Sequence, residues 1–74
     1  MSDKKIATAA KKTIGEKIKT VRKKKKLTQT QLAERMDAPT SQIGDWERGA
    51  KTPGLRSLIK IADALGCPVV KLIE

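Results

Sequence analysis

Apolar residues recur every three to four positions along most of this chain, which is the period of helices that bury one face. The pattern predicts an all-α fold in which five helices form one domain, with starts near residues 13, 28, 40, 55 and 68. The predicted core takes the residues on the apolar faces of these helices: Ile14, Ile18, Val21, Leu32, Ala33, Met36, Ile43, Trp46, Leu55, Leu58, Ala62, Leu65, Leu72 and Ile73. Ile59 is also expected to point inward, and Ile61 falls near the boundary of its face.

Local signals mark the ends of several of these helices. Thr13 precedes Glu16 by three residues, and Thr28 precedes Gln31 by the same interval. This is the spacing of a capping box, in which each side chain accepts a hydrogen bond from the other residue's backbone amide. Gly66 suits the left-handed residue that ends the helix starting near residue 55.

Two of the predicted helices, at residues 28–36 and 40–48, are short and lie three residues apart. Pro39 ends the first of them, because proline has no amide to donate and disfavours helical geometry in the preceding residue. Gly49 suits a left-handed cap at the end of the second helix. Two short helices joined by so tight a turn form a helix-turn-helix pattern.

The helix at residues 40–48 has two unlike faces. Ile43 and Trp46 point to one side. The opposite face is polar and comprises Thr40, Ser41, Gly44, Asp45 and Arg48. A short, narrow polar face is what a helix entering the major groove of DNA requires. Gly44 on this face would let a base or sugar come close, although neutral drift at an exposed position explains a glycine as well.

The charge of the chain is concentrated at one end. The net charge is +9, and residues 1–26 alone carry eleven Lys and Arg against two acidic residues, so residues 27–74 are neutral overall. A one-sided basic patch is typical of proteins that bind polyanions. The small, polar composition of residues 1–12 favours a flexible, disordered arm. Its lysines, Lys4, Lys5, Lys11 and Lys12, could reach around a duplex, and an arm without function is a comparable alternative.

Several function classes lack their usual residues. The chain has no histidine and a single cysteine, Cys67, so a metal site, a nucleophile–base pair and an intrachain disulfide are not expected. No apolar run is long enough to span a membrane, and no signal peptide is recognisable. We therefore expect a cytoplasmic, nucleoid-associated protein that is not an enzyme and has no cofactor, small-molecule ligand or membrane partner.

In their order along the chain, these features resemble the Cro/phage-repressor class of helix-turn-helix proteins, the XRE family, over about residues 14–73. The resemblance rests on Leu27-Thr28-Gln29, Leu32-Ala33, Ile43, Trp46-Glu47-Arg48-Gly49, Pro53 and Ile61-Ala62-Asp63-Ala64-Leu65-Gly66. It implies a compact lambda-repressor-like domain of five helices at residues 13–74, behind the arm at residues 1–12. Members often have glycine where this chain has Asp37, and a serine-like cap where it has Pro39. These departures concern the turn more than the fold.

The resemblance also implies which residues contact DNA. Base contacts are expected from Thr40, Ser41, Gln42 and Asp45. Phosphate contacts are expected from Gln29, Arg48, Lys51 and Thr52, and by charge from Lys23, Lys24, Lys25 and Lys26. Asp45 would accept from the exocyclic amine of cytosine, or would merely face solvent. Gln29 could instead serve only as a helix-start residue.

Two structural contacts complete the expected site. The resemblance places Arg22 against Glu47 as a partly buried ion pair, although Arg22 could also face a phosphate. Val69, Leu72 and Ile73 give the last helix more apolar surface than so short a helix can bury in its own domain. Because this region often forms the two-fold contact in the family, these three residues are expected to form the contact of a weak homodimer.

The residues and the resemblance together predict a sequence-specific double-stranded DNA-binding transcriptional regulator of the repressor kind. It would read the major groove with residues 40–48, at an operator that is an approximate inverted repeat. A Cro-like repressor, a restriction–modification controller and a DNA-binding antitoxin are alternatives within this class. The alternative from another class is a protein-interaction adaptor or bridging coactivator. Bridging coactivators have a similar domain, and the Ile43-Gly44-Asp45 segment before an aromatic–glutamate pair also resembles theirs.

Overall fold

The computed structural model describes residues 13–74, so the expected arm at residues 1–12 lies outside the described part of the chain. Within residues 13–74 all regular structure is helical, which confirms the all-α prediction. The five helices of this part are α2 (Ile14–Lys24), α3 (Gln29–Met36), α4 (Thr40–Arg48), α5 (Leu55–Leu65) and α6 (Val70–Ile73).

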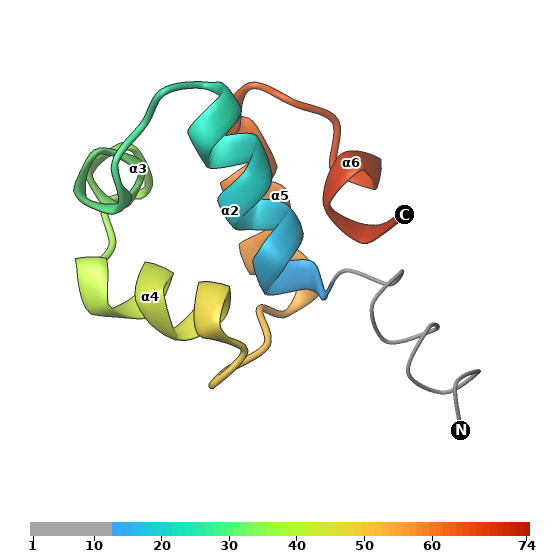
Figure 1. Ribbon diagram of the computed structural model, residues 1–74, viewed down its shortest axis with the longest axis horizontal. Helices are drawn as coiled ribbons and strands as arrows, with labels where there is room; N and C mark the ends of the chain where they lie inside the picture. Colours follow the sequence, from blue (N-terminus) through green and yellow to red (C-terminus); the bar gives the residue numbers. More distant parts are fainter. Residues whose placement is uncertain (1–12) are drawn as a thin grey trace, which may run out of the picture.

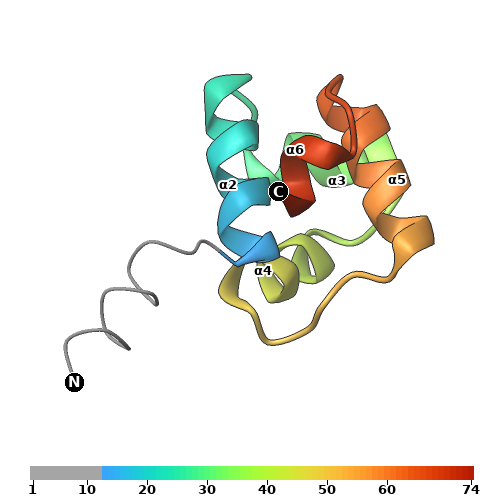
Figure 2. The same cartoon turned by 90° about the vertical axis from the view of Figure 1, so that its right-hand side faces the viewer.

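In Figure 1 helix α5 lies behind α2 in the middle of the view, and the two helices are in contact. The pair α3 and α4 lies on one side of α2, and α6 lies on the other. The view from the side shows α6 between α2 and α5 (Figure 2). Helix α4 packs against α2 and α3 and lies at the edge of the bundle (Figure 1).

Both predicted capping boxes are present. Thr13 Oγ1 accepts from the Glu16 amide at 3.1 Å, and Glu16 Oε1 accepts from the Thr13 amide at 3.0 Å. Thr28 Oγ1 accepts from the Gln31 amide at 3.0 Å, and Gln31 Oε1 accepts from the Thr28 amide at 2.8 Å. These reciprocal bonds satisfy amides that have no partner inside the helix, so they fix the first turns of α2 and α3.

The turn between α3 and α4 shows how the chain accommodates its two unusual residues. Asp37 adopts the left-handed conformation with φ 55°, which aspartate tolerates better than most residues. The Ala38 amide then donates to the Ala33 carbonyl at 2.9 Å and closes the end of α3. Pro39 is the extended N-cap of α4 and offers no side-chain cap. The turn thus keeps its geometry without the glycine and the capping hydroxyl.

A second left-handed residue was not anticipated. Lys26 has φ 59° and directly follows Lys25, the C-cap of α2. This conformation lets the Leu27 amide donate to the Arg22 carbonyl at 3.1 Å, the closing bond of a left-handed helix end. Lysine adopts the left-handed region only at a cost, because its Cβ crowds the following carbonyl. The lysine run therefore contains a strained turn as well as charge.

The core confirms most of the predicted positions. The fully buried apolar side chains within residues 13–74 include members of every described helix: Ile18, Leu32, Ile43, Ile61, Leu65 and Leu72. Ile14, Val21 and Met36 are partly buried against this cluster. The buried residues of α5 are Leu58, Ile61, Ala62 and Leu65.

Three residues expected inside are outside. Leu55 is 70% exposed, Ile59 50% and Ile73 51%, whereas Ile61, expected at a boundary, is completely buried. The stripe of α5 is rotated toward Ile61, which leaves Ile59 off the packed face. Leu55 lies in the first turn of α5, and the four-residue α6 turns only one large side chain, Leu72, into the core.

Gly15 brings α2 unusually close to the end of α4. A Cβ built at this position would lie 2.0 Å from the Trp46 carbonyl oxygen, a backbone atom that cannot move aside cheaply. Only glycine therefore permits this approach. Its place within a capping box gave no signal of this role, because the contact comes from a residue about thirty positions away in sequence.

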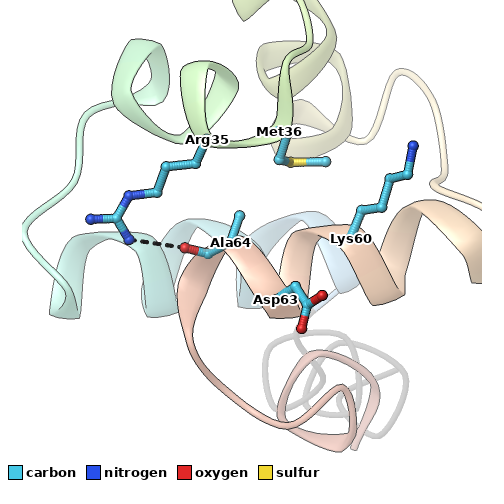
Figure 3. Close-up of a pocket in the computed structure, with 5 residues that line it drawn as sticks. All are labelled: Arg35, Met36, Lys60, Asp63 and Ala64. Atoms are coloured by element: carbon cyan, nitrogen blue, oxygen red, sulfur yellow. Dashed lines mark hydrogen bonds between the residues drawn. The ribbon is translucent and has the colours of Figure 1, made fainter.

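Helix α3 is also attached to the end of α5. Arg35 Nη1 donates to the Ala64 carbonyl oxygen at 3.0 Å, across a surface pocket that Met36, Lys60 and Asp63 also line (Figure 3). A cation at a helix carboxyl end is favourable, since the last carbonyls carry partial negative charge. No helix within residues 13–74 has the length and apolar character needed to cross a bilayer.

Candidate nucleic-acid interface

Helix α4 separates an apolar inner face from a polar outer face, as its sequence predicts. Ile43 is fully buried and Trp46 is 5% exposed, so both anchor the helix to the core. The residues expected to contact bases are on the accessible side: Ser41 is exposed, and Thr40, Gln42 and Asp45 are partly exposed. The structure therefore gathers the four expected base-contacting residues on one surface helix.

A buried hydrogen-bond network fixes this helix to its neighbours. Arg22 Nε donates to Glu47 Oε2 at 2.6 Å, and Arg22 Nη2 donates to Glu47 Oε1 at 3.0 Å. The side chains of this pair are only 8% and 3% exposed. Arg22 Nη1 also donates to the Leu27 carbonyl at 2.7 Å, which ties the turn after α2 to the same guanidinium. Three N–H groups of the guanidinium are thus bonded inside the domain, so Arg22 is a structural link between α2, the following turn and α4.

Gln29 is the third member of this network. Its Nε2 donates to Glu47 Oε1 at 3.0 Å, so a single carboxylate joins α2, the first residue of α3 and the end of α4. The sequence gave no sign of this bond. An amide nitrogen carries two hydrogens, so Gln29 retains one donor for a ligand. The first-turn amides of α3 have no carbonyl partner within the helix, which makes this end attractive to an anion.

The remaining expected phosphate contacts are at the surface in two groups. Lys23, Lys24, Lys25 and Lys26 are exposed at the end of α2 and in the connection to α3. Arg48, Lys51 and Thr52 are exposed at the end of α4 and in the following loop. Basic side chains thus lie before α3 and after α4.

Arg48 and Gly44 differ from expectation in their surroundings. Arg48 Nη2 donates to Asp45 Oδ1, so its guanidinium lies beside a residue expected to read bases. Gly44, which we expected to be open on the outer face, is buried. The nearest atom to a Cβ built on Gly44 is Arg48 Nη1, at 2.9 Å. The Arg48 side chain, rather than open space, thus occupies the position that glycine leaves free.

The expected dimer contact requires one correction. Leu72 is completely buried in the core of its own domain, so it cannot be part of a contact surface. Ile73 is 51% exposed, and Val69 is partly buried against the core. The other large apolar residues exposed on the two C-terminal helices are Leu55, Ile59 and Val70. Exposed apolar side chains are therefore found on α5 as well as on α6.

Among residues 13–74 no group of three or more His, Cys, Asp or Glu could hold a metal ion. Cys67 is a free, partly buried thiol.

In this bundle α3 ends in a left-handed turn at Asp37, and the short α4 follows with its apolar face buried. This arrangement defines a helix-turn-helix domain. The helix-turn-helix family matches residues 18–72, and this chain belongs to that family, in its XRE type. The family consists of DNA-binding regulators and is not a class of enzymes.

One relative by sequence is the immunity repressor protein of Bacillus phage phi105. The two are 43% identical over 61 residues, which is 82% of this chain and 42% of that protein. This chain thus matches less than half the length of that repressor.

Two solved structures are similar over nearly their whole length. The restriction–modification controller protein C.AhdI from Aeromonas hydrophila has a TM-score of 0.78 and 30% identity, with 81% of this chain and 91% of that chain covered. The P22 c2 repressor in complex with a synthetic operator also has a TM-score of 0.78 and 30% identity, with 86% and 97% covered.

Proposed function

We propose that this chain is a sequence-specific double-stranded DNA-binding transcriptional regulator of the repressor kind, acting in the cytoplasm on the nucleoid. Helix α4 enters the major groove, and its outer residues read base edges. The similarity to a repressor seen with its operator supports this proposal, as does the relation to a phage immunity repressor.

The observation that carries the proposal is how α4 is held. The Arg22–Glu47–Gln29 network fixes the inner side of the helix at both α2 and α3, while Thr40, Ser41, Gln42, Asp45 and Arg48 remain exposed or partly exposed. A protein that reads sequence needs such a rigid, projecting helix, because base contacts depend on a fixed register in the groove. Thr40, Ser41, Gln42 and Asp45 supply the donors and acceptors for these contacts.

Phosphate contacts orient the domain on the duplex. The amino end of α3 and the remaining amide hydrogen of Gln29 bind one phosphate group. Glu47 orients the Gln29 side chain through their hydrogen bond, so the network that holds α4 also positions this donor. Lys51 and Thr52 contact the backbone after α4, and Lys23–Lys26 add attraction that does not depend on sequence.

The functional unit is a weak homodimer on an approximate inverted repeat. One domain of this size reads only a few base pairs, so discrimination requires two half-sites about 34–36 Å apart or a multiple of that distance. The exposed apolar side chains at the C-terminal end supply the contact surface: Leu55, Ile59, Val70 and Ile73, with Val69 beside them. Leu72 is buried in the core and is not part of this surface.

Selection of bound duplexes from a random DNA pool, followed by competition against a scrambled duplex, tests the proposal. We expect an enriched inverted repeat, a footprint over two half-sites and steep weakening with salt. The variant Val70→Asp/Ile73→Asp should protect a half-site only at higher protein concentration, whereas Lys71→Asp on the same helix should keep the two half-sites coupled. Equal affinity for selected and scrambled duplexes would refute sequence-specific binding and favour the adaptor alternative.

A further inference from the structure

Asp45 and Arg48 form a single unit on the outer face of α4. Arg48 Nη2 donates to Asp45 Oδ1, one helical turn back along the chain. The Arg48 side chain is 67% exposed and that of Asp45 is 27% exposed, so the pair stands at the surface. Its place on the helix turns the guanidinium toward the amino end of α4, and away from the loop that follows Gly49.

Gly44 makes room for this arrangement. A Cβ at this position would be 2.9 Å from Arg48 Nη1, which is closer than real Cβ atoms come to a neighbour. Glycine in the middle of a helix is unfavourable relative to alanine, because it loses more backbone freedom on folding. The space gained is the space in which the guanidinium lies. Asp45 therefore binds the Arg48 guanidinium on the outer face, in the space that Gly44 leaves free.

The electrostatics of the pair favour a base over a phosphate. An arginine that serves a phosphate gains most when its full positive charge meets the backbone. Here the carboxylate of Asp45 offsets that charge and is itself repelled by phosphates. The guanidinium nevertheless has five N–H donors, of which Asp45 takes one. What remains is a planar set of donors, the geometry that matches the O6 and N7 acceptors of guanine.

We infer that Arg48, held by Asp45 over Gly44, is a specificity-determining residue that recognises the guanine of a G·C pair in the major groove. The inference rests on the proposed function and deepens it, since it assigns to Arg48 a base edge in place of the phosphate expected from the sequence. Asp45 acts as the positioning residue for the guanidinium.

Base-by-base affinity measurement tests this assignment. Starting from the selected duplex, each position of the half-site is replaced by the other three base pairs, and the Kd is measured for the wild type, Arg48→Ala, Gly44→Ala and Lys51→Ala. The wild type should prefer G at one position by about 5- to 150-fold, the range of one good bidentate base contact. Arg48→Ala should lose that preference and keep the others.

The other variants separate the geometry from the charge. Gly44→Ala retains every charge but displaces the guanidinium, so it should relax the preference at the same base pair. Lys51→Ala removes an equal charge from the same end of α4, and should weaken all duplexes by one common factor and lower the salt slope by about 0.9. Circular dichroism confirms that each variant is folded.

Uniform weakening by Arg48→Ala, with a loss of salt dependence like that of Lys51→Ala, would show that Arg48 contacts a phosphate and would overturn the inference while sequence-specific binding stands. Loss of preference at different base pairs in Arg48→Ala and Gly44→Ala would also overturn it. A wild type that does not discriminate between selected and scrambled duplexes would remove the proposed function and this inference together.

Discussion

Helix α4 takes part in two arginine–carboxylate pairs, which consist of the same chemical groups in opposite surroundings. On its inner face Arg22 meets Glu47 through two hydrogen bonds, and the side chains are 8% and 3% exposed. On its outer face Arg48 meets Asp45 through one hydrogen bond, with side chains 67% and 27% exposed. The inner pair joins residues 25 positions apart, and the outer pair joins residues three apart.

The difference shows that exposure decides what an ion pair can do. A buried charge left without its partner keeps its full desolvation cost, so the inner pair is stable once formed and fixes the helix. An exposed pair exchanges its partner for water at little cost, so the outer pair remains available to a ligand. One helix thus has a face that is locked to the protein and a face that is free to exchange contacts.

Breaking the inner pair should have the largest effect. Arg22→Ala leaves Glu47 buried and unpaired, and should lower the free energy of unfolding by about 3–5 kcal/mol. Thermal and urea unfolding of Arg22→Ala, Glu47→Ala and the double variant provide the measurement. The double variant should be less destabilised than the sum of the single variants. Additive losses would show that the two residues do not interact.

A change that forces the inner face of α4 away from α2 should have the next largest effect on stability. Gly15→Ala places a Cβ against the Trp46 carbonyl, and relief of the overlap requires the backbone to shift. We expect the free energy of unfolding to fall by about 1–3 kcal/mol, the usual range for an overpacked site. Gly54→Ala is the control, because no atom beyond the adjacent residues lies within 4 Å of the Cβ that it adds. Equal urea midpoints for the two variants would contradict this account of Gly15.

The turn after α2, in which the Leu27 amide donates to the Arg22 carbonyl, can be made more stable without a change in either ion pair. Lys26→Gly relieves a left-handed lysine and should raise the free energy of unfolding by about 0.5–1 kcal/mol, after the larger entropy of the unfolded glycine chain is counted. Lys25→Gly removes the same charge at a residue with φ −83°. This control should be no more stable than the wild type in a thermal melt.

Breaking the outer pair should have the smallest effect on stability. Arg48→Ala should change the free energy of unfolding by only about 0.3–0.5 kcal/mol, and less at high salt, because an exposed pair on one helix is weak. The urea midpoint at low and high salt measures this change. A loss comparable to that of Arg22→Ala would mean that exposure does not distinguish the two faces.

Local sequence patterns predict most of the helical architecture. The capping residues Thr13 and Thr28 and the terminating Gly49 and Gly66 act within a few residues of their own positions, and each adopts its expected conformation. Features that depend on distant packing were missed or misplaced. The close approach at Gly15 depends on the path of α4, so its role cannot be recognised without the fold.

Burial was likewise predicted less well where it depends on packing between helices. Helical period alone placed Ile59 inward and Ile61 at a boundary, because it does not show the angle at which neighbouring helices press on α5. The short α6 buries Leu72, a predicted core residue that the apolar surface of the last helix and the family resemblance also assigned to a dimer contact.

The candidate site was only partly accessible to sequence reasoning. The polar face of α4 follows from its period, and the juxtaposition of Arg22 and Glu47 followed from the family resemblance. The bond from Gln29 to Glu47 and the position of Arg48 over Gly44 depend on side-chain conformations, which no spacing rule supplies. Which bases the outer residues recognise remains a prediction.

The network at Glu47 also has a consequence for motion. Since one carboxylate joins α2, α3 and α4, the end of α4 cannot fray without also disrupting the ends of its neighbours. Amide hydrogens in α4 should therefore exchange with solvent only through large-scale opening, whereas those of the four-residue α6 should exchange through local opening. A surface helix held in this way is preorganised. It meets the duplex already ordered, so little binding free energy is lost to immobilising it.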